Sequence, residues 1–145
     1  MSDRQSKRRG RGQFLPRVLC LEDRTVPATF YVDPALIEYS VNLANATRRP
    51  ADIGLGDLAR YVSFGASPRA SINLILAGRA LAFIRGRDYV LPHDVTTLAL
   101  DVLRHRLVLS YEALADNVTP DDILTRVMAA LPVPEAPLRR TLAAR

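Results

Sequence analysis

The residues best placed to do chemistry stand in one short block, Gly65-Ala66-Ser67-Pro68-Arg69-Ala70. Ser67 is a residue type that caps helices, and Pro68 suits a first helical turn because the amide hydrogen it lacks would be unpaired there. Arg69 then places a positive charge at the helix end that favours negative charge. A guanidinium in this position is stabilised when it faces an anion, since helix amides and an arginine together make a good phosphate site. The block is therefore a candidate for an anion contact.

A purely structural role for Arg69 is the competing interpretation. Its side chain could lie over the apolar surface of the domain, or it could form an ion pair with Asp57 or Asp101. Arginines commonly do both, because the long stem is apolar and the head is charged. The residue types alone leave the two interpretations open.

Several other kinds of chemistry are excluded by residue type and spacing. The only lysine is Lys7, so the folded part cannot hold the lysine that a phosphate-binding P-loop requires. Cys20 is the single cysteine, which excludes an intramolecular disulfide and a cysteine-rich metal site. His93 and His105 stand twelve residues apart with no cysteine near them, unlike the ligands of a zinc site. Ser110 has no partnered base that could activate it as a nucleophile. From these exclusions together we expect no catalytic residue and no metal site.

Four predicted helices must position these residues, and each begins with a proline. Apolar residues at helical spacing predict helices over residues 34–48, 68–85, 92–103 and 120–131. Asp33, Ser67 and Thr119 are the expected N-caps of the first, second and fourth. The second helix is apolar on nearly all faces, so we expect it to be the most buried element, with Leu76 in the core.

Shorter segments connect the predicted helices. Residues 55–62 form a brief amphipathic piece, and residues 89–91 are expected to be extended. Residues 107–109 fit either a short strand or a continuation of the preceding helix, because three residues are too few to show a period. The pattern predicts an all-α fold, a small four-helix bundle with short links.

The charge distribution separates an N-terminal tail from this domain. The 145 residues carry a formal net charge of +5, and residues 1–30 contain seven basic and three acidic residues, a net of +4. The run from Lys7 to Arg11 has no apolar side chain to bury, so residues 1–30 are expected to be a disordered basic tail. Residues 31–132 form the predicted helical domain and residues 133–145 a Pro/Arg-rich C-terminal tail. No apolar run reaches the roughly 18–20 residues that a transmembrane helix needs.

The tail supports two alternative functions. Its basic arm, together with a basic helix near Arg104, would suit a nucleic-acid-binding module, although such a run is more often a solvated arm. Residues 21–30, Leu-Glu-Asp-Arg-Thr-Val-Pro-Ala-Thr-Phe, resemble a short sorting motif near the N-terminus of planctomycete surface proteins. That resemblance implies an envelope-associated interaction protein as the second alternative.

A second resemblance covers residues 33–131. The block at residues 65–70, the block Gly86-Arg87-Asp88-Tyr89-Val90 and the block Val102-Leu103-Arg104-His105-Arg106-Leu107 resemble the C-terminal lid of MoxR-family AAA+ ATPases, in that family's order and spacing. The resemblance implies that Arg69 is a sensor-2 arginine. Such an arginine reaches the γ-phosphate of ATP held by the preceding α/β domain, and Ser67 would lie beside it. Leu91 stands where the family usually has a capping Thr or Ser before Pro92.

The resemblance also implies what a lid does not supply. Walker A, Walker B, sensor 1 and the arginine finger belong to the α/β domain, and these 145 residues contain no matching sequence. We therefore expect a truncated or stand-alone lid domain that hydrolyses nothing and holds no cofactor alone. ATP and Mg²⁺ are implied only together with an AAA+ α/β core, in cis, in trans or in a neighbouring subunit. A cytoplasmic location follows from this interpretation, and the cell envelope from the sorting motif.

Overall fold

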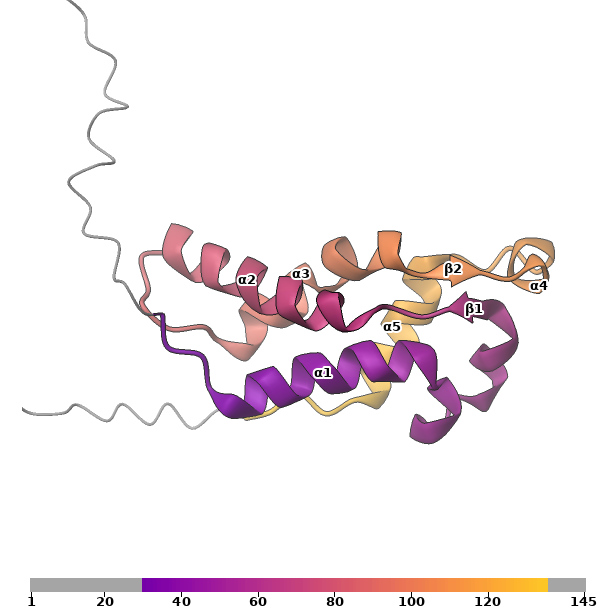
Figure 1. The fold of residues 1–145 in the computed structure, drawn as a ribbon, viewed down its shortest axis with the longest axis horizontal. Helices are drawn as coiled ribbons and strands as arrows, with labels where there is room; N and C mark the ends of the chain where they lie inside the picture. Colours follow the sequence, from indigo (N-terminus) through magenta and orange to yellow (C-terminus); the bar gives the residue numbers. More distant parts are fainter. Residues whose placement is uncertain (1–29, 136–145) are drawn as a thin grey trace, which may run out of the picture.

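A computed structural model describes residues 30–135 of the chain, and residues 1–29 and 136–145 lie outside the described part. The predictions for the basic tail, the sorting motif and the end of the chain fall almost entirely on those outer residues. Two long helices, α1 (Pro34–Arg48) and α2 (Pro68–Ile84), lie side by side (Figure 1). Helix α3 (Pro92–Leu103) packs on α2, and α5 (Pro120–Ala130) packs against α1 and α3. The described residues thus form the predicted small helical bundle.

Short elements fill the connections between these helices. Strands β1 (Val62–Phe64) and β2 (Val108–Leu109) form an antiparallel ribbon in which Phe64 lies opposite Val108. The open question at residues 107–109 is therefore answered by a strand, because β1 supplies a hydrogen-bonding partner that the local sequence does not reveal. The remaining elements are the five-residue helix α4 and three 3₁₀ turns: Tyr111–Ala115, Pro50–Ile53, Gly56–Tyr61 and Arg104–Arg106.

The helix starts follow the sequence prediction, since α1, α2, α3 and α5 each have proline in the first turn. The Asp33 carboxylate accepts a hydrogen bond from the Ala35 amide at 2.9 Å, as expected of an N-cap. Leucine has no side-chain acceptor, so at α3 the Leu91 amide instead donates to the Asp94 carboxylate at 2.9 Å. This bond explains why α3 begins at Pro92 without a capping Thr or Ser.

The chain enters the domain beside the C-terminal end of α2. Tyr31 forms a parallel bridge with Tyr89, in which the Tyr31 amide donates to the Asp88 carbonyl at 2.9 Å. The ring of Phe30 packs edge-on against Phe83, with 6.0 Å between ring centroids. The extended link predicted at residues 89–91 is thus held by backbone hydrogen bonds to the first described residues.

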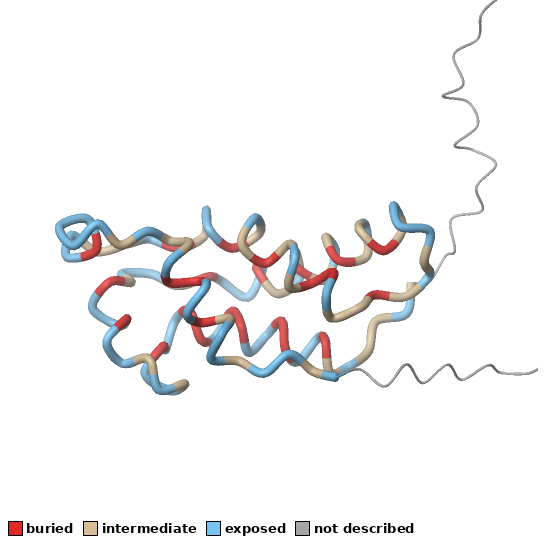
Figure 2. Tube along the Cα trace, turned by 180° about the vertical axis from the view of Figure 1, so that it is seen from behind, coloured by how far each residue is buried: buried red, intermediate tan, exposed pale blue. Residues whose placement is uncertain are grey.

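One hydrophobic core lies between the four longer helices, and Figure 2 shows its buried residues at intervals along each of them. Its largest fully buried apolar side chains are Leu36, Leu43, Leu58, Leu74, Leu103, Val95, Ile123, Leu124 and Val127.

Helix α2 differs from the prediction that it is buried on all sides with Leu76 in the core. Leu76 is 52% exposed, and the buried residues of α2 are the mostly small Ala70, Leu74, Gly78 and Ala82. A Cβ on Gly78 would lie only 3.2 Å from Val90 Cγ1, so small residues on this face allow the α3 side of the bundle to approach closely. The large apolar residues are left on the outer face. The prediction for Leu76 was wrong for this reason.

Candidate functional site

The candidate site lies where the loop before α2 crosses the end of α1. Gly65 approaches α1 so closely that a Cβ there would lie 2.5 Å from the Thr47 carbonyl oxygen and 2.6 Å from the Arg48 amide nitrogen. Both neighbours are backbone atoms, which cannot move aside without disturbing α1. A glycine is required at residue 65 because of this contact.

Two side chains from the end of α1 hold the next residue of the loop. The Thr47 hydroxyl accepts a hydrogen bond from the Ala66 amide at 2.9 Å and donates one to the Ala44 carbonyl at 2.7 Å. Arg48 donates from Nε to the Ala66 carbonyl at 2.7 Å. Both backbone groups of Ala66, which is fully buried, are therefore bonded to α1. The sequence analysis missed these partners because they lie 18 and 19 residues away along the chain.

The block at residues 65–70 thus divides into a docked part and an exposed part. Ala66 and Ala70 are fully buried against the domain, whereas Ser67, Pro68 and Arg69 are exposed. Docking of the loop fixes where α2 begins. It thereby sets the position of Arg69 on the surface.

Ser67 occupies the N-cap position of α2, but its side chain does not act as predicted. Its backbone is extended, with φ −76° and ψ 165°, and its hydroxyl makes no capping hydrogen bond. The Ala70 amide is instead satisfied by the Ser67 carbonyl at 2.8 Å, which closes the first turn through the backbone. The exposed hydroxyl and the first-turn amides therefore lie together at the helix start.

Arg69 forms no ion pair with any residue of the described part of the chain. The two carboxylates considered as partners are engaged elsewhere: Asp57 with Arg126 at 2.7 Å, and Asp101 with Arg104 at 3.2 Å. The hydrogen bond from Arg126 is the largest influence on Asp57 and lowers the pKa of its carboxyl. The positive charge of Arg69 is therefore exposed to solvent at the helix start.

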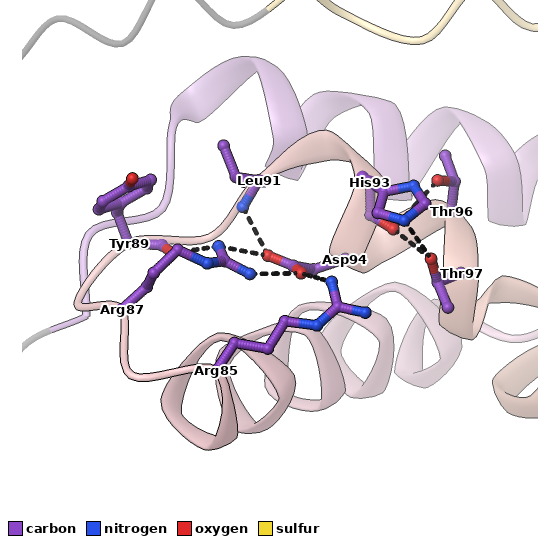
Figure 3. A network of polar contacts seen from close by, with 8 residues as sticks. All are labelled: Arg85, Arg87, Tyr89, Leu91, His93, Asp94, Thr96 and Thr97. Atoms are coloured by element: carbon purple, nitrogen blue, oxygen red, sulfur yellow. Dashed lines mark hydrogen bonds and ion pairs between the residues drawn. The ribbon is translucent and has the colours of Figure 1, made fainter.

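A second polar cluster, absent from the sequence analysis, links the end of α2 to the start of α3 (Figure 3). The Asp94 carboxylate is fully buried and accepts hydrogen bonds from Arg85 at 2.8 Å and from Arg87 at 2.7 and 2.8 Å. Burial raises the pKa of Asp94, but the bonds from Arg87 and the Leu91 amide, with the charges of both arginines, outweigh it and hold that pKa below its ordinary value. All the acceptors of Asp94 are occupied, so this cluster holds the fold together.

The remaining candidates within the described residues 30–135 are the two histidines and Arg104. The residues that the structure describes contain no group of three His, Cys, Asp or Glu side chains able to hold a metal ion. His105 is exposed in the 3₁₀ turn Arg104–Arg106. Arg104, named for the nucleic-acid alternative, pairs with Asp101 and also with Asp121 at 3.3 Å, so part of its charge is neutralised. No described helix is long and apolar enough to cross a bilayer.

Comparison with known proteins identifies relatives of this domain. The AAA lid domain family matches residues 57–131. The chaperone MoxR1 of Mycobacterium tuberculosis is 48% identical over 110 residues, which cover 76% of this chain and 29% of that protein. The MoxR protein of Paracoccus denitrificans is 38% identical over 112 residues, which cover 73% of this chain and 33% of that protein.

A solved structure shares the fold. The crystal structure of a protein assigned as an ATPase in Cytophaga hutchinsonii superimposes with a TM-score of 0.71 and 38% sequence identity. The match covers 74% of this chain and 32% of that chain. The chain thus spans about a third of the length of the proteins that it matches.

Proposed function

Since the chain belongs to the MoxR family of AAA+ ATPases and corresponds to its C-terminal lid region, we propose that it completes a nucleotide site on an AAA+ α/β core. In this role Arg69 contacts a phosphate of ATP bound to the core, and Ser67 lies beside it at the same helix start. The core belongs to the same polypeptide, to a separate chain or to a neighbouring subunit. The 145 residues alone hydrolyse no nucleotide.

The observation that carries this proposal is the state of the Arg69 side chain. It is exposed, and the two carboxylates considered as its structural partners, Asp57 and Asp101, are bound to other arginines. An exposed arginine on a rigidly docked helix start is suited to an anion that arrives from outside the domain. The guanidinium adds a planar pair of donors that match phosphate oxygens.

The contribution of Arg69 to hydrolysis would be electrostatic. Charge builds up on the phosphate oxygens as the bond to the leaving group breaks, and a fixed cation stabilises that charge. Mg²⁺, when bound by the core with ATP, would neutralise part of the same charge. One arginine and one helix start supply too few contacts to hold ATP, so the chain alone should bind it only weakly.

A fusion protein tests the proposal. The α/β region of the Cytophaga hutchinsonii relative, without its own matching lid segment, is placed ahead of Met1 of the full chain, and ATP hydrolysis is measured. Arg69→Ala should lower hydrolysis about tenfold or more, as expected when a donor to a developing charge is removed. Arg69→Lys should hydrolyse ATP at a rate between those of the unsubstituted fusion and Arg69→Ala, because lysine keeps the charge but not the paired donors.

Arg49→Ala is the matched control, since Arg49 is also exposed and forms no ion pair among residues 30–135. It should leave hydrolysis unchanged. Equal hydrolysis by the Arg69→Ala and Arg49→Ala fusions would refute the proposal. Measurable hydrolysis, or micromolar ATP affinity, by the chain without a core would refute it independently.

A further inference from the structure

We propose that the chain covers its own apolar groove: residues 14–21, Phe-Leu-Pro-Arg-Val-Leu-Cys-Leu, dock between α1 and α2 of the same molecule. The groove between these two helices has a volume of about 340 Å³. Its apolar walls are Ile37 and Val41 from α1 and Ile72, Ile75 and Leu76 from α2. This contact is separate from the helix start that carries Arg69, which does not line the groove.

The exposure of the wall residues shows that the described part of the chain leaves the groove open. Ile72 is 59% exposed and Leu76 52%, and Ile37 and Val41 on the facing helix are 47% and 41% exposed. Single exposed apolar residues are common, but a contiguous apolar groove on a small domain is typical of a surface that contacts another segment or protein. An apolar occupant is therefore expected.

The chain enters the described domain at one end of this groove. Arg79 lines that end, and its guanidinium lies over the ring of Phe30, 5.8 Å from the ring centroid. Phe30 also packs edge-on against Phe83, so both contacts hold it beside the C-terminal half of α2. The residues that directly precede Phe30 in the sequence are therefore tethered at the Arg79 end of the groove.

The chain between this tether and the proposed segment is long enough for docking. Ser71 and Arg79, which line the two ends of the groove on α2, are eight positions apart, about 12 Å at 1.5 Å per residue. Residues 14–21 can extend over roughly 26 Å, and the linker of residues 22–29 over a similar length. A linker this short keeps the segment at an effective concentration on the order of millimolar, so a modest contact is enough to hold it.

Composition distinguishes residues 14–21 from the basic run at residues 7–11. Most of the large apolar side chains that precede Phe30 lie in this segment, namely Phe14, Leu15, Val18, Leu19 and Leu21. Burial of such side chains against an apolar surface is favourable, whereas the basic run has none to bury. The proposal therefore separates residues 14–21 from the disordered tail expected for the rest of residues 1–30.

Charge sets the direction in which the segment lies. No acidic residue lines the groove, and Arg79 forms no ion pair within residues 30–135. Glu22 and Asp23 directly follow the apolar segment. With Leu21 at the Arg79 end, these two carboxylates come beside that guanidinium, and residues 24–29 have only to return to Phe30.

The natural thiol of Cys20 lies in the proposed segment and provides the test. Its reaction with a maleimide is measured in the full chain, folded and in concentrated urea, by mass spectrometry. The folded chain should react about fivefold more slowly, because docking removes the thiol from solvent and a buried cysteine is inert. Ser6→Cys in a Cys20→Ser background is the control, since residue 6 precedes the segment. It should react at similar rates in both conditions.

A pair of leucine substitutions shows whether the groove is the surface that protects Cys20. Leu76→Asp places a charge in the groove and should raise the folded-state rate of Cys20 to the rate in urea. Leu114→Asp is the matched control, because Leu114 is 66% exposed on α4 and does not line the groove. It should leave Cys20 protected.

Every other outcome overturns the proposal. Equal rates for Cys20 in the folded chain and in urea would show that the segment does not dock. Protection that Leu76→Asp does not relieve would place the segment on a different surface. Protection that weakens as the protein is diluted would identify the occupant as the segment of a second copy. The test uses no nucleotide and no AAA+ core, so its result is independent of the role proposed for Arg69.

Discussion

Leu74 and Leu76 lie two residues apart on α2, yet Leu74 has no exposed surface whereas Leu76 is 52% exposed. The two side chains point to opposite sides of the helix, Leu74 into the core and Leu76 into an apolar groove between α1 and α2 that Ile37, Val41 and Ile72 also line. The same residue type therefore stabilises the domain at one position and offers a contact at the other.

This difference predicts unequal effects of two alanine substitutions. Leu74→Ala should lower the free energy of unfolding by about 2–5 kcal/mol, the usual loss for a fully buried leucine that leaves a cavity. Leu76→Ala should lower it by no more than about 1 kcal/mol, the free energy that corresponds to the fivefold protection expected of Cys20. Urea denaturation followed by circular dichroism measures both. An equal loss for the two variants would mean that Leu76 packs as deeply as Leu74.

Substitution of Gly65 by alanine should lower the stability of the domain far more than the same substitution at another glycine. A Cβ at residue 65 meets backbone atoms of Thr47 and Arg48, so Gly65→Ala should lower the free energy of unfolding by about 1–3 kcal/mol, as overpacking does. Gly56→Ala is the control, because its Cβ would meet only the Ala51 Cβ at 4.0 Å. Thermal unfolding distinguishes them. A harmless Gly65→Ala would show that the loop does not dock on α1.

Asp94→Asn should destabilise the domain in a pH-dependent manner. Loss of the buried charge leaves Arg85 and Arg87 without their shared partner, and we expect a loss of about 3 kcal/mol at pH 7, at the low end for broken buried pairs because both arginines retain contact with water. Since folding lowers the pKa of Asp94, its contribution is complete above the ordinary aspartate pKa of about 3.9 and disappears as the pH falls through the folded-state value.

The difference in stability between wild type and Asp94→Asn should therefore stay constant from neutral pH to about pH 5 and shrink below about pH 4. Urea midpoints across this range provide the test. Asp88→Asn is the control, because Asp88 is exposed and its side chain makes no hydrogen bond within the described residues. A wild-type advantage that grew on acidification would contradict the charge arrangement.

Arg69→Ala should leave the stability of the chain unchanged within about 0.5 kcal/mol, because the side chain is exposed and contributes no ion pair within residues 30–135. Calorimetric unfolding of wild type and variant is the measurement. A loss of about 1 kcal/mol or more would favour a structural role for this arginine and weaken its assignment to the nucleotide.

The helix starts could be predicted from the sequence because proline, Asp33 and Thr119 act within one turn of themselves. Strand β2 could not be predicted in this way, since its partner β1 lies more than 40 residues away along the chain. Leu76 was misplaced because an all-apolar helix is expected to be buried on every side, whereas α2 buries mostly small residues and leaves large ones exposed. Apolar periodicity therefore does not distinguish the face of α2 that packs in the core from the face that is exposed.

The position of Arg69 at a helix start could be predicted from its neighbours Ser67 and Pro68. The contacts that hold this helix start in place could not be predicted. Ser67 was correctly placed at the helix start, and its hydroxyl was wrongly expected to bond a first-turn amide. The contacts that fix the loop come from Thr47 and Arg48, on a different helix. Asp94 was missed for the same reason, because its arginine partners are brought to it by the turn that follows α2.

The two hydrogen bonds that join Ala66 to Thr47 and Arg48 connect the end of α1 directly to the start of α2. A rotation of α1 must carry Arg69 with it, because the intervening loop has neither a free backbone group at Ala66 nor room for a side chain at Gly65. A force applied to Arg69 by a bound anion, as proposed above, would therefore be passed to α1 through the backbone of Ala66.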